Sequence, residues 1–256
     1  MNSNVGATHK EKNIYLWLTK FTNRNKKPEK TFCGTESRSL RTPSTDTTKH
    51  IATMNHPIRF TTPEEAVKVI KSGDHVHLSS VASVPQILVR AMTARGEAGE
   101  LQHVHIHHLH TEGEALYAVP EMEGIFQLDS FFVGGNVRNI TQQGFADYIP
   151  VFLSETQRLY RDGILPCNVA MIQVSTPDRH GYVSLGTSVD ATLAAVECAD
   201  TVIAVVNRHV PRSFGDSFIH TSQIDLFVED DTPLIEEHFA EPNDLECAIG
   251  RNCAAL

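Results

Sequence analysis

The sequence has no long hydrophobic run, few cysteines and little positive charge. No apolar stretch among its 256 residues approaches the roughly 18 that a membrane-spanning helix needs, which argues against a membrane protein. The 31 acidic residues outnumber the 22 basic ones, giving a net charge of -9, and a nucleic-acid partner would need a basic face. The five cysteines show no CxxC spacing, so neither a disulfide framework nor a zinc finger is indicated and a reducing compartment is favoured.

Positive charge is concentrated in residues 1–53. This stretch holds ten basic and four acidic residues, a net charge of +6, whereas the remainder carries 12 basic and 27 acidic residues, a net charge of -15. Because the stretch has little apolar surface to bury, we predict that residues 1–53 are a disordered basic extension before a folded body over 54–256. The alternatives are a mitochondrial presequence and an upstream stretch translated ahead of a true start at Met54. We expect a cytoplasmic protein, or a mitochondrial one if the presequence is genuine.

Helices and strands alternate along the body. The runs 169–174 and 201–206 are continuously apolar, as strands buried on both faces require, and an alanine-rich helix is predicted between them over 188–198. Further helices are predicted from Thr62 to Gly73, from Ser83–Pro85 to Gly96, from Ser154 to Asp162 and after Asn243, and further strands over 74–79, 101–109 and 128–133. The predicted fold class is therefore α/β, with a mainly parallel sheet flanked by helices.

Histidines alternate along the predicted strand over 101–109. His103, His105 and His107 would share one face of that strand, and His108 and His110 the other. A transition-metal site is one interpretation, but the helical Glu-x-x-His and His-x-x-x-His pairings of many metal sites are missing here. We predict no metal at these histidines, and the same melting temperature with and without a chelator.

Two further stretches place polar residues at turns. The stretch 132–138 predicts a strand, a glycine turn and a helix whose first amides, with Arg138, suit a phosphate or carboxylate, although a tight turn alone explains it equally well. It is not a GxGxxG dinucleotide motif. Asp216, Ser217 and His220 are close in sequence, but no GxSxG motif exists and adjacency does not supply the geometry of a hydrolase triad.

Taken in order, several stretches resemble the acetyl-CoA hydrolase/transferase family, which includes the 4-hydroxybutyrate, butyrate and acetate CoA-transferases. The matching stretches are 64–78, 131–155, 172–192, 211–225 and 248–251. The resemblance extends from about Phe60 to Leu256 and implies a CoA-transferase-type domain that forms the N-terminal half of a two-domain enzyme.

The resemblance also implies a reaction. A glutamate carboxylate attacks an acyl-CoA thioester, an acyl-glutamyl anhydride and then a glutamyl-CoA thioester form, and a carboxylic acid resolves the latter. Water as the acceptor would give hydrolysis. The implied substrates are acetyl-, butyryl- or 4-hydroxybutyryl-CoA and a short-chain carboxylate such as acetate. Coenzyme A is a substrate, no cofactor is implied, and we expect the complete enzyme to be a homo-oligomer.

The family places its nucleophilic glutamate and its CoA-holding loop in the second domain, after the stretch 248–251. None of the glutamates present matches that motif, so we predict no catalytic residue here, a second domain missing after residue 256, and no activity of this chain alone. The first domain would form one wall of the cleft between the domains. From their turn positions at sheet edges, the residues predicted to line it are Ser79, Ser80, Gly134, Gly135, Asn136, Arg138, Gly215, Asp216, Ser217 and His220.

Three other interpretations remain open at this point. The chain could be a non-catalytic subunit or binding module that completes an active site with another chain. It could instead bind a metal through the histidines over 103–110, or be a hydrolase that uses Asp216, Ser217 and His220.

Overall fold

The computed structural model describes residues 58–238 and 240–256. The predicted disordered extension over residues 1–53 therefore lies outside the described residues. Within the described part, no helix is both long enough and apolar enough to cross a membrane.

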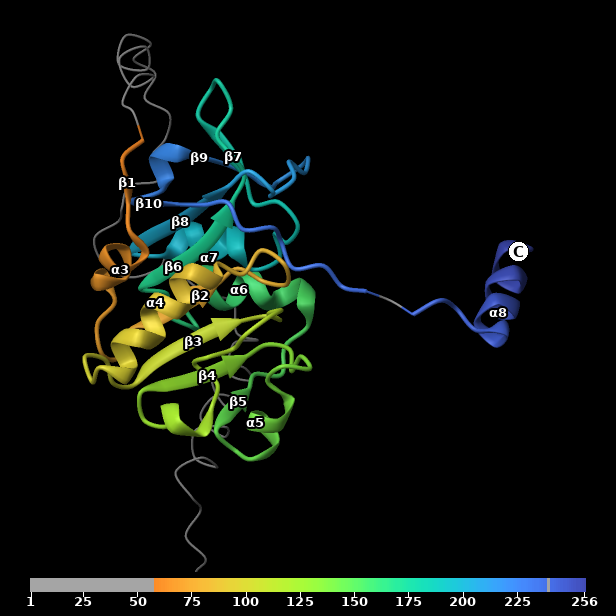
Figure 1. The fold of residues 1–256 in the computed structure, drawn as a ribbon, viewed down its shortest axis with the longest axis horizontal. Coiled ribbons are helices and arrows are strands. Elements are labelled where there is room, and N and C mark those ends of the chain that lie inside the picture. Colours follow the sequence, from red (N-terminus) through yellow and green to blue (C-terminus); the bar gives the residue numbers. More distant parts are fainter. Residues whose placement is uncertain (1–57, 239) are drawn as a thin grey trace, which may run out of the picture. The chain divides into compact units, whose positions relative to one another are not determined.

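The body is built on an eight-stranded sheet in which every pairing is parallel (Figure 1). Its strands, in sheet order, are β1 (Phe60–Thr61), β10 (Leu226–Asp230), β8 (Thr201–Asn207), β6 (Val169–Val174), β2 (His75–Leu78), β3 (Val104–His108), β4 (Phe126–Ser130) and β5 (Ala146–Tyr148). A small antiparallel sheet pairs β7 (Tyr182–Ser184) with β9 (Phe218–His220). The predicted α/β class with a parallel sheet is confirmed.

The helices of the described part are short apart from two. They are α3 (Pro63–Ala66), α4 (Gln86–Glu97), α5 (Arg138–Gln142), α6 (Thr156–Arg161), α7 (Thr192–Cys198) and α8 (Asp244–Ala254). The cap predicted at Thr62 forms, since its side chain accepts a hydrogen bond from the Glu65 amide, and the capping box of Asn243 forms as well.

Three predicted helices differ in their bounds, each for a local reason. The first ends before Gly73, because the Arg95 guanidinium binds the carbonyls of Val67 and Ile70 where the backbone leaves the helix. The capping box predicted at Ser154 does not form, since residues 153–155 make a 3-10 turn and α6 begins after it. The alanine-rich helix begins at Thr192 rather than 188, because Asp190 has a φ of +23°, which a right-handed helix cannot accommodate.

The strand order reverses direction at β2. From β2, the chain adds β3, β4 and β5 on one side, and it later adds β6, β8 and β10 on the other. The loops after β2 and β6 therefore diverge at the carboxyl ends of two adjacent strands. Crevices at such a switch point are where open α/β sheets bind their ligands.

The two faces of β2 and β3 are covered differently. On one face, Val76, Leu78 and Ile106 belong to an apolar core that includes Leu88 and Met92 of α4. On the other, His77 bonds to side chains of α6 and α7. Figure 1 shows α4 in front of the sheet, with α6 and α7 behind it.

Candidate functional site

The loops that follow β2, β3 and β4 meet at the carboxyl edge of the sheet. The Val81 amide donates to the His110 carbonyl at 2.6 Å, which joins the first loop to the second. The Asn136 side-chain amide donates to Thr111 Oγ1 and to the Gly113 carbonyl, both at 3.3 Å, which joins the third loop to the second. The structure thus brings the predicted stretches 79–80 and 134–136 together.

Ser79 and Ser80 lie at the switch point of the sheet. The Ser79 amide donates to the Met171 carbonyl of β6 at 3.1 Å, so the turn after β2 is fixed against that strand. Both residues are buried, and neither hydroxyl has a hydrogen-bond partner among the described residues. A buried hydroxyl without a partner costs free energy, so these two positions are unusual for a protein interior.

The two glycines in the turn after β4 have different surroundings. A Cβ atom at Gly134 would lie 2.6 Å from the His110 ring, so any larger residue would require that ring to move. Gly135 is exposed with open space where a Cβ would be, and its backbone is accessible to a ligand. Arg138 is exposed at the first position of α5. This turn therefore offers accessible backbone and one cation at the same edge of the sheet.

The stretch 215–220 is connected to this edge only indirectly. The Leu185 amide donates to the Ser217 carbonyl at 2.8 Å, and Ser83, in the loop after β2, donates to the Leu185 carbonyl at 3.4 Å. Ser217 is buried, whereas Gly215 and Asp216 are exposed.

The side chains of this stretch are engaged elsewhere. The Ser217 hydroxyl donates to the Ser213 carbonyl at 2.6 Å, and His220 Nδ1 pairs with the Ser222 hydroxyl at 2.8 Å. Ser217 and His220 thus each have another partner, and the geometry gives no support to a Ser-His-Asp hydrolase.

A pocket that the sequence did not predict lies beside these loops. Its volume is about 240 Å³, and its walls come from the loop after β2, the start of α4, the loop after β3, the end of β6 and the segment after β10. Gln86 and Gln173 are among the residues that line it, and Arg90 and Glu114 form an ion pair at 3.4 Å in its wall. No sequence motif marks this pocket, because its walls come from segments more than 100 residues apart.

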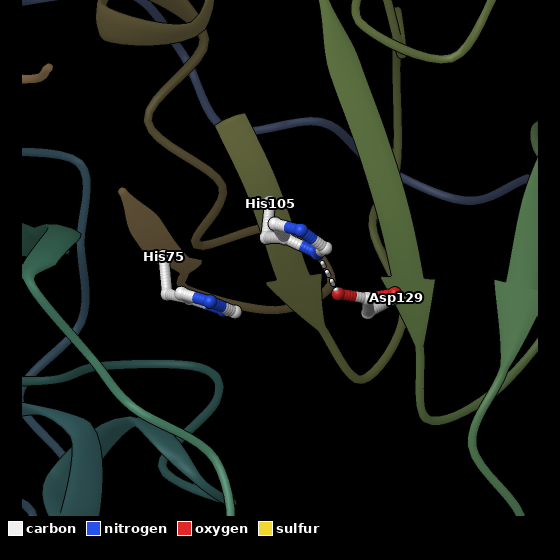
Figure 2. A group of neighbouring side chains, drawn as sticks. All are labelled: His75, His105 and Asp129. Carbon is white, nitrogen blue, oxygen red and sulfur yellow. Dashed lines mark hydrogen bonds and ion pairs between the residues drawn. The ribbon is translucent and has the colours of Figure 1, made fainter. Parts of the chain in front are cut away.

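A second polar cluster lies on β2, β3 and β4, and Figure 2 shows three of its side chains, His75, His105 and Asp129. His105 Nδ1 is 2.7 Å from Asp129 Oδ2, and the rings of His75 and His105 stack with centroids 4.4 Å apart. His107 Nε2 lies 3.0 Å from His75 Nδ1 and 3.4 Å from Asp129 Oδ2. Donor atoms of three strands therefore converge on one spot.

The environment fixes the charges of this cluster. Burial, with repulsion from His107 and His105, lowers the pKa of His75 to about 4. Burial alone would raise the pKa of Asp129, but hydrogen bonds from His105 and His107 lower it to about 2. The hydrogen bond to Asp129 raises the pKa of His105. At neutral pH the cluster thus holds an ionised carboxylate and at least one neutral imidazole.

His77, on the same strand as His75, is completely buried. Its Nδ1 pairs with the Tyr160 hydroxyl at 3.0 Å and its Nε2 with Thr192 Oγ1 at 3.1 Å, so both ring nitrogens are satisfied. Complete burial lowers the pKa of His77 to about 3. It is a neutral structural histidine that ties the sheet to α6 and α7.

Comparison with known proteins identifies the family of this chain. The acetyl-CoA hydrolase/transferase N-terminal domain matches residues 45–236. The chain belongs to this family. A 4-hydroxybutyrate coenzyme A transferase of Clostridium kluyveri is 40% identical over 198 residues, 77% of this chain and 46% of that protein. A succinyl-CoA:acetate/propanoyl-CoA:succinate CoA transferase of Fasciola hepatica is 35% identical over 188 residues, 73% of this chain and 39% of that protein.

Solved structures of similar proteins have the same fold. A 4-hydroxybutyrate CoA-transferase from Porphyromonas gingivalis has a TM-score of 0.64 at 33% identity, covering 77% of this chain and 45% of its own. RipA from Yersinia pestis has a TM-score of 0.71 at 28% identity, covering 77% and 47%. The chain therefore spans about half the length of the CoA-transferases that it matches, and it has the CoA-transferase-type domain expected from its resemblance to the family.

Proposed function

We propose that this chain is the N-terminal half of a CoA-transferase that moves CoA between an acyl-CoA and a short-chain carboxylate. The observation that carries the proposal is the match at 40% identity along 77% of the chain to a 4-hydroxybutyrate coenzyme A transferase. A butyryl-CoA:acetate CoA-transferase of Anaerostipes caccae is 34% identical over 187 residues and supports the same substrate class. We place the reaction in the cytoplasm, or in mitochondria if residues 1–53 are a presequence.

The chemistry would require a glutamate that the second half of the enzyme supplies. Its carboxylate attacks the thioester carbon and the CoA thiolate leaves, which gives an acyl-glutamyl anhydride. The thiolate then attacks the glutamyl carbonyl and releases the original acyl group as a carboxylate. The acceptor carboxylate takes CoA from the resulting glutamyl thioester by the same two steps in reverse.

The half described here would supply the opposing wall of the cleft. The hydroxyls of Ser79 and Ser80 would donate to a carboxylate or a developing oxyanion, since neither has a hydrogen-bond partner among the described residues. The accessible backbone of Gly135 would let a substrate approach closely, and Arg138 would attract its negative charge. Coenzyme A is the substrate, and no further cofactor is proposed.

Reconstitution from two halves tests this proposal. We would mix the purified chain with the C-terminal half of the Clostridium kluyveri relative and measure CoA transfer from butyryl- or 4-hydroxybutyryl-CoA to acetate. Neither half alone should have activity, and the mixture should regain some. Ser80→Ala in the reconstituted enzyme should lower the rate about ten- to a hundredfold, the value of a hydrogen bond to a charged group.

The matched control is Glu123→Gln, an exposed residue before β4 at the opposite edge of the sheet. It should leave the rate unchanged. Because the Ser80 hydroxyl has no hydrogen-bond partner within residues 58–238 and 240–256, Ser80→Ala should not lower the melting temperature, so a lost rate would not reflect unfolding. Turnover by the isolated chain would contradict the proposal. A complex that forms and binds CoA without any turnover would favour the non-catalytic subunit instead.

A further inference from the structure

We propose that His75, His105 and Asp129 form a binding site for an exchangeable divalent transition-metal ion. One donor comes from each of β2, β3 and β4. The sequence led us to predict no metal at residues 103–110. Of the three donors, only His105 lies in that stretch. His75 lies on β2 and Asp129 lies on β4.

The strand register places the three donors together. His75 and His105 are directly paired on β2 and β3, and Asp129 on β4 is the partner of His107, two residues along. One ligand atom from each of the three side chains lies within 4.8 Å of the other two. Tetrahedral zinc at about 2.0 Å from each ligand needs donors about 3.3 Å apart, so small side-chain rotations would complete the site.

His107 supports this arrangement from below. It is completely buried, and its Nε2 faces both His75 and Asp129 at 3.0 and 3.4 Å. Its Nδ1 has no hydrogen-bond partner among the described residues. A ring held between two ligands fixes their orientation, which is the role of outer-shell residues in metal sites.

The cluster is open to solvent on its outer side. The His105 side chain is 36% exposed and the Asp129 side chain 13% exposed, so an ion can reach the donors without unfolding the sheet. Asp129 bonds to His105, and His75 bonds to His107, so each of the three donors has a partner within the protein. Because these pairs hold the side chains in place, we expect that a chelator does not unfold the protein.

The donor set selects the class of ion. Two imidazole nitrogens and one carboxylate suit zinc, cobalt, nickel or ferrous iron, whereas magnesium and calcium prefer oxygen ligands. His75 is four residues before Ser79 along the chain, roughly 13 Å in an extended strand. The ion would thus lie away from the loops proposed to bind CoA, and this inference does not depend on the proposed function.

Zinc binding to the full chain tests the site. The protein must carry no histidine tag and be treated with chelator, and zinc is titrated by calorimetry with the bound metal counted by elemental analysis. We expect one ion per chain. His105→Gln and Asp129→Asn should each weaken the affinity at least tenfold. Cobalt should give a visible absorption band that both variants lose, and neither magnesium nor calcium should compete.

The chain has 14 histidines, so the comparison between variants decides the result. His180→Gln is the matched control, because it removes an exposed histidine from the turn before β7 without touching the cluster. Zinc should raise the melting temperature of the wild type and of His180→Gln but not of the other two variants. Equal zinc affinity in all four proteins would overturn the proposal. If Asp129→Asn fails to fold, the partly exposed His105→Gln decides alone.

Discussion

On the face of β2 and β3 toward α4, Val76, Leu78 and Ile106 pack into an apolar core. On the opposite face, the same strands carry His77 and His107, which are just as deeply buried. The apolar face needs only side chains of suitable size. On the histidine face, a buried polar group without a partner costs about 1–3 kcal/mol, and both ring nitrogens of His77 have partners on α6 and α7. Two faces of one sheet thus reach the same burial by different physical means.

The apolar face should be the more sensitive to lost volume. Ile106→Ala removes buried methyl groups at a site that is 0% exposed, and we expect it to lower the free energy of unfolding by about 2–5 kcal/mol. Urea denaturation followed by circular dichroism measures this loss. Ile106→Val is the matched control, with an expected loss of about 1 kcal/mol. Equal losses for the two variants would show that this face tolerates cavities.

The second prediction concerns the loss of stability at low pH, and it involves one buried histidine from each face. His77 lies on the histidine face and His108 on the apolar face, and burial lowers the pKa of both to about 3. Unfolded histidine has a pKa of 6.5, so the unfolded chain takes up protons first as the pH falls. Stability is therefore fully present above pH 6.5 and should fall from there toward pH 3, in metal-free buffer, by up to about 1.4 kcal/mol per pH unit for each ring.

His108 permits a test of that slope. Neither of its ring nitrogens has a side-chain partner in the described part of the chain, and its ring packs edge-on against Tyr117 at 5.9 Å. His108→Phe keeps the shape, so urea midpoints between pH 7 and pH 4 should fall less steeply than those of the wild type. His105, whose pKa is raised, contributes in the opposite sense and loses its contribution as the pH rises. An unchanged slope in His108→Phe would show that this ring is not protonated on unfolding.

The smallest expected effect comes from removing residues 1–53, which precede the strands of both faces in the sequence. A chain that begins at Met54 should keep the same far-ultraviolet helix signal and the same melting temperature, since the removed stretch has little apolar surface to bury. Thermal melts of the full and shortened chains, recorded side by side, measure this. A fall of several degrees would mean that the extension contributes to the stability of the folded body.

Much of the fold was predictable because the signals are local. The apolar runs over 169–174 and 201–206 became β6 and β8, and the caps at Thr62 and Asn243 formed as expected. The end of the first helix was not predictable. It depends on Arg95, which reaches back from α4 to bind carbonyls 25 and 28 residues earlier.

The candidate site was predictable only in part. Turn residues pointed to the stretches 79–80 and 134–136, and the loops do bring these stretches together. That these two stretches line a substrate cleft remains a prediction. The cluster of His75, His105 and Asp129 could not be assembled from the sequence, although the alternating histidines of two strands were visible, because no local pattern shows which strands pair or in what register.

By itself, the sequence determined the α/β class, the family and the two-residue alternation that sends His105 to one face and Ile106 to the other. Each depends on neighbouring residues or on long motifs in order. The tertiary structure alone decided that β2 lies between β3 and β6, and therefore which side chains share the switch point and which share the histidine cluster. The reason is physical: strand order and register depend on contacts between residues far apart in the chain, and no single segment contains them.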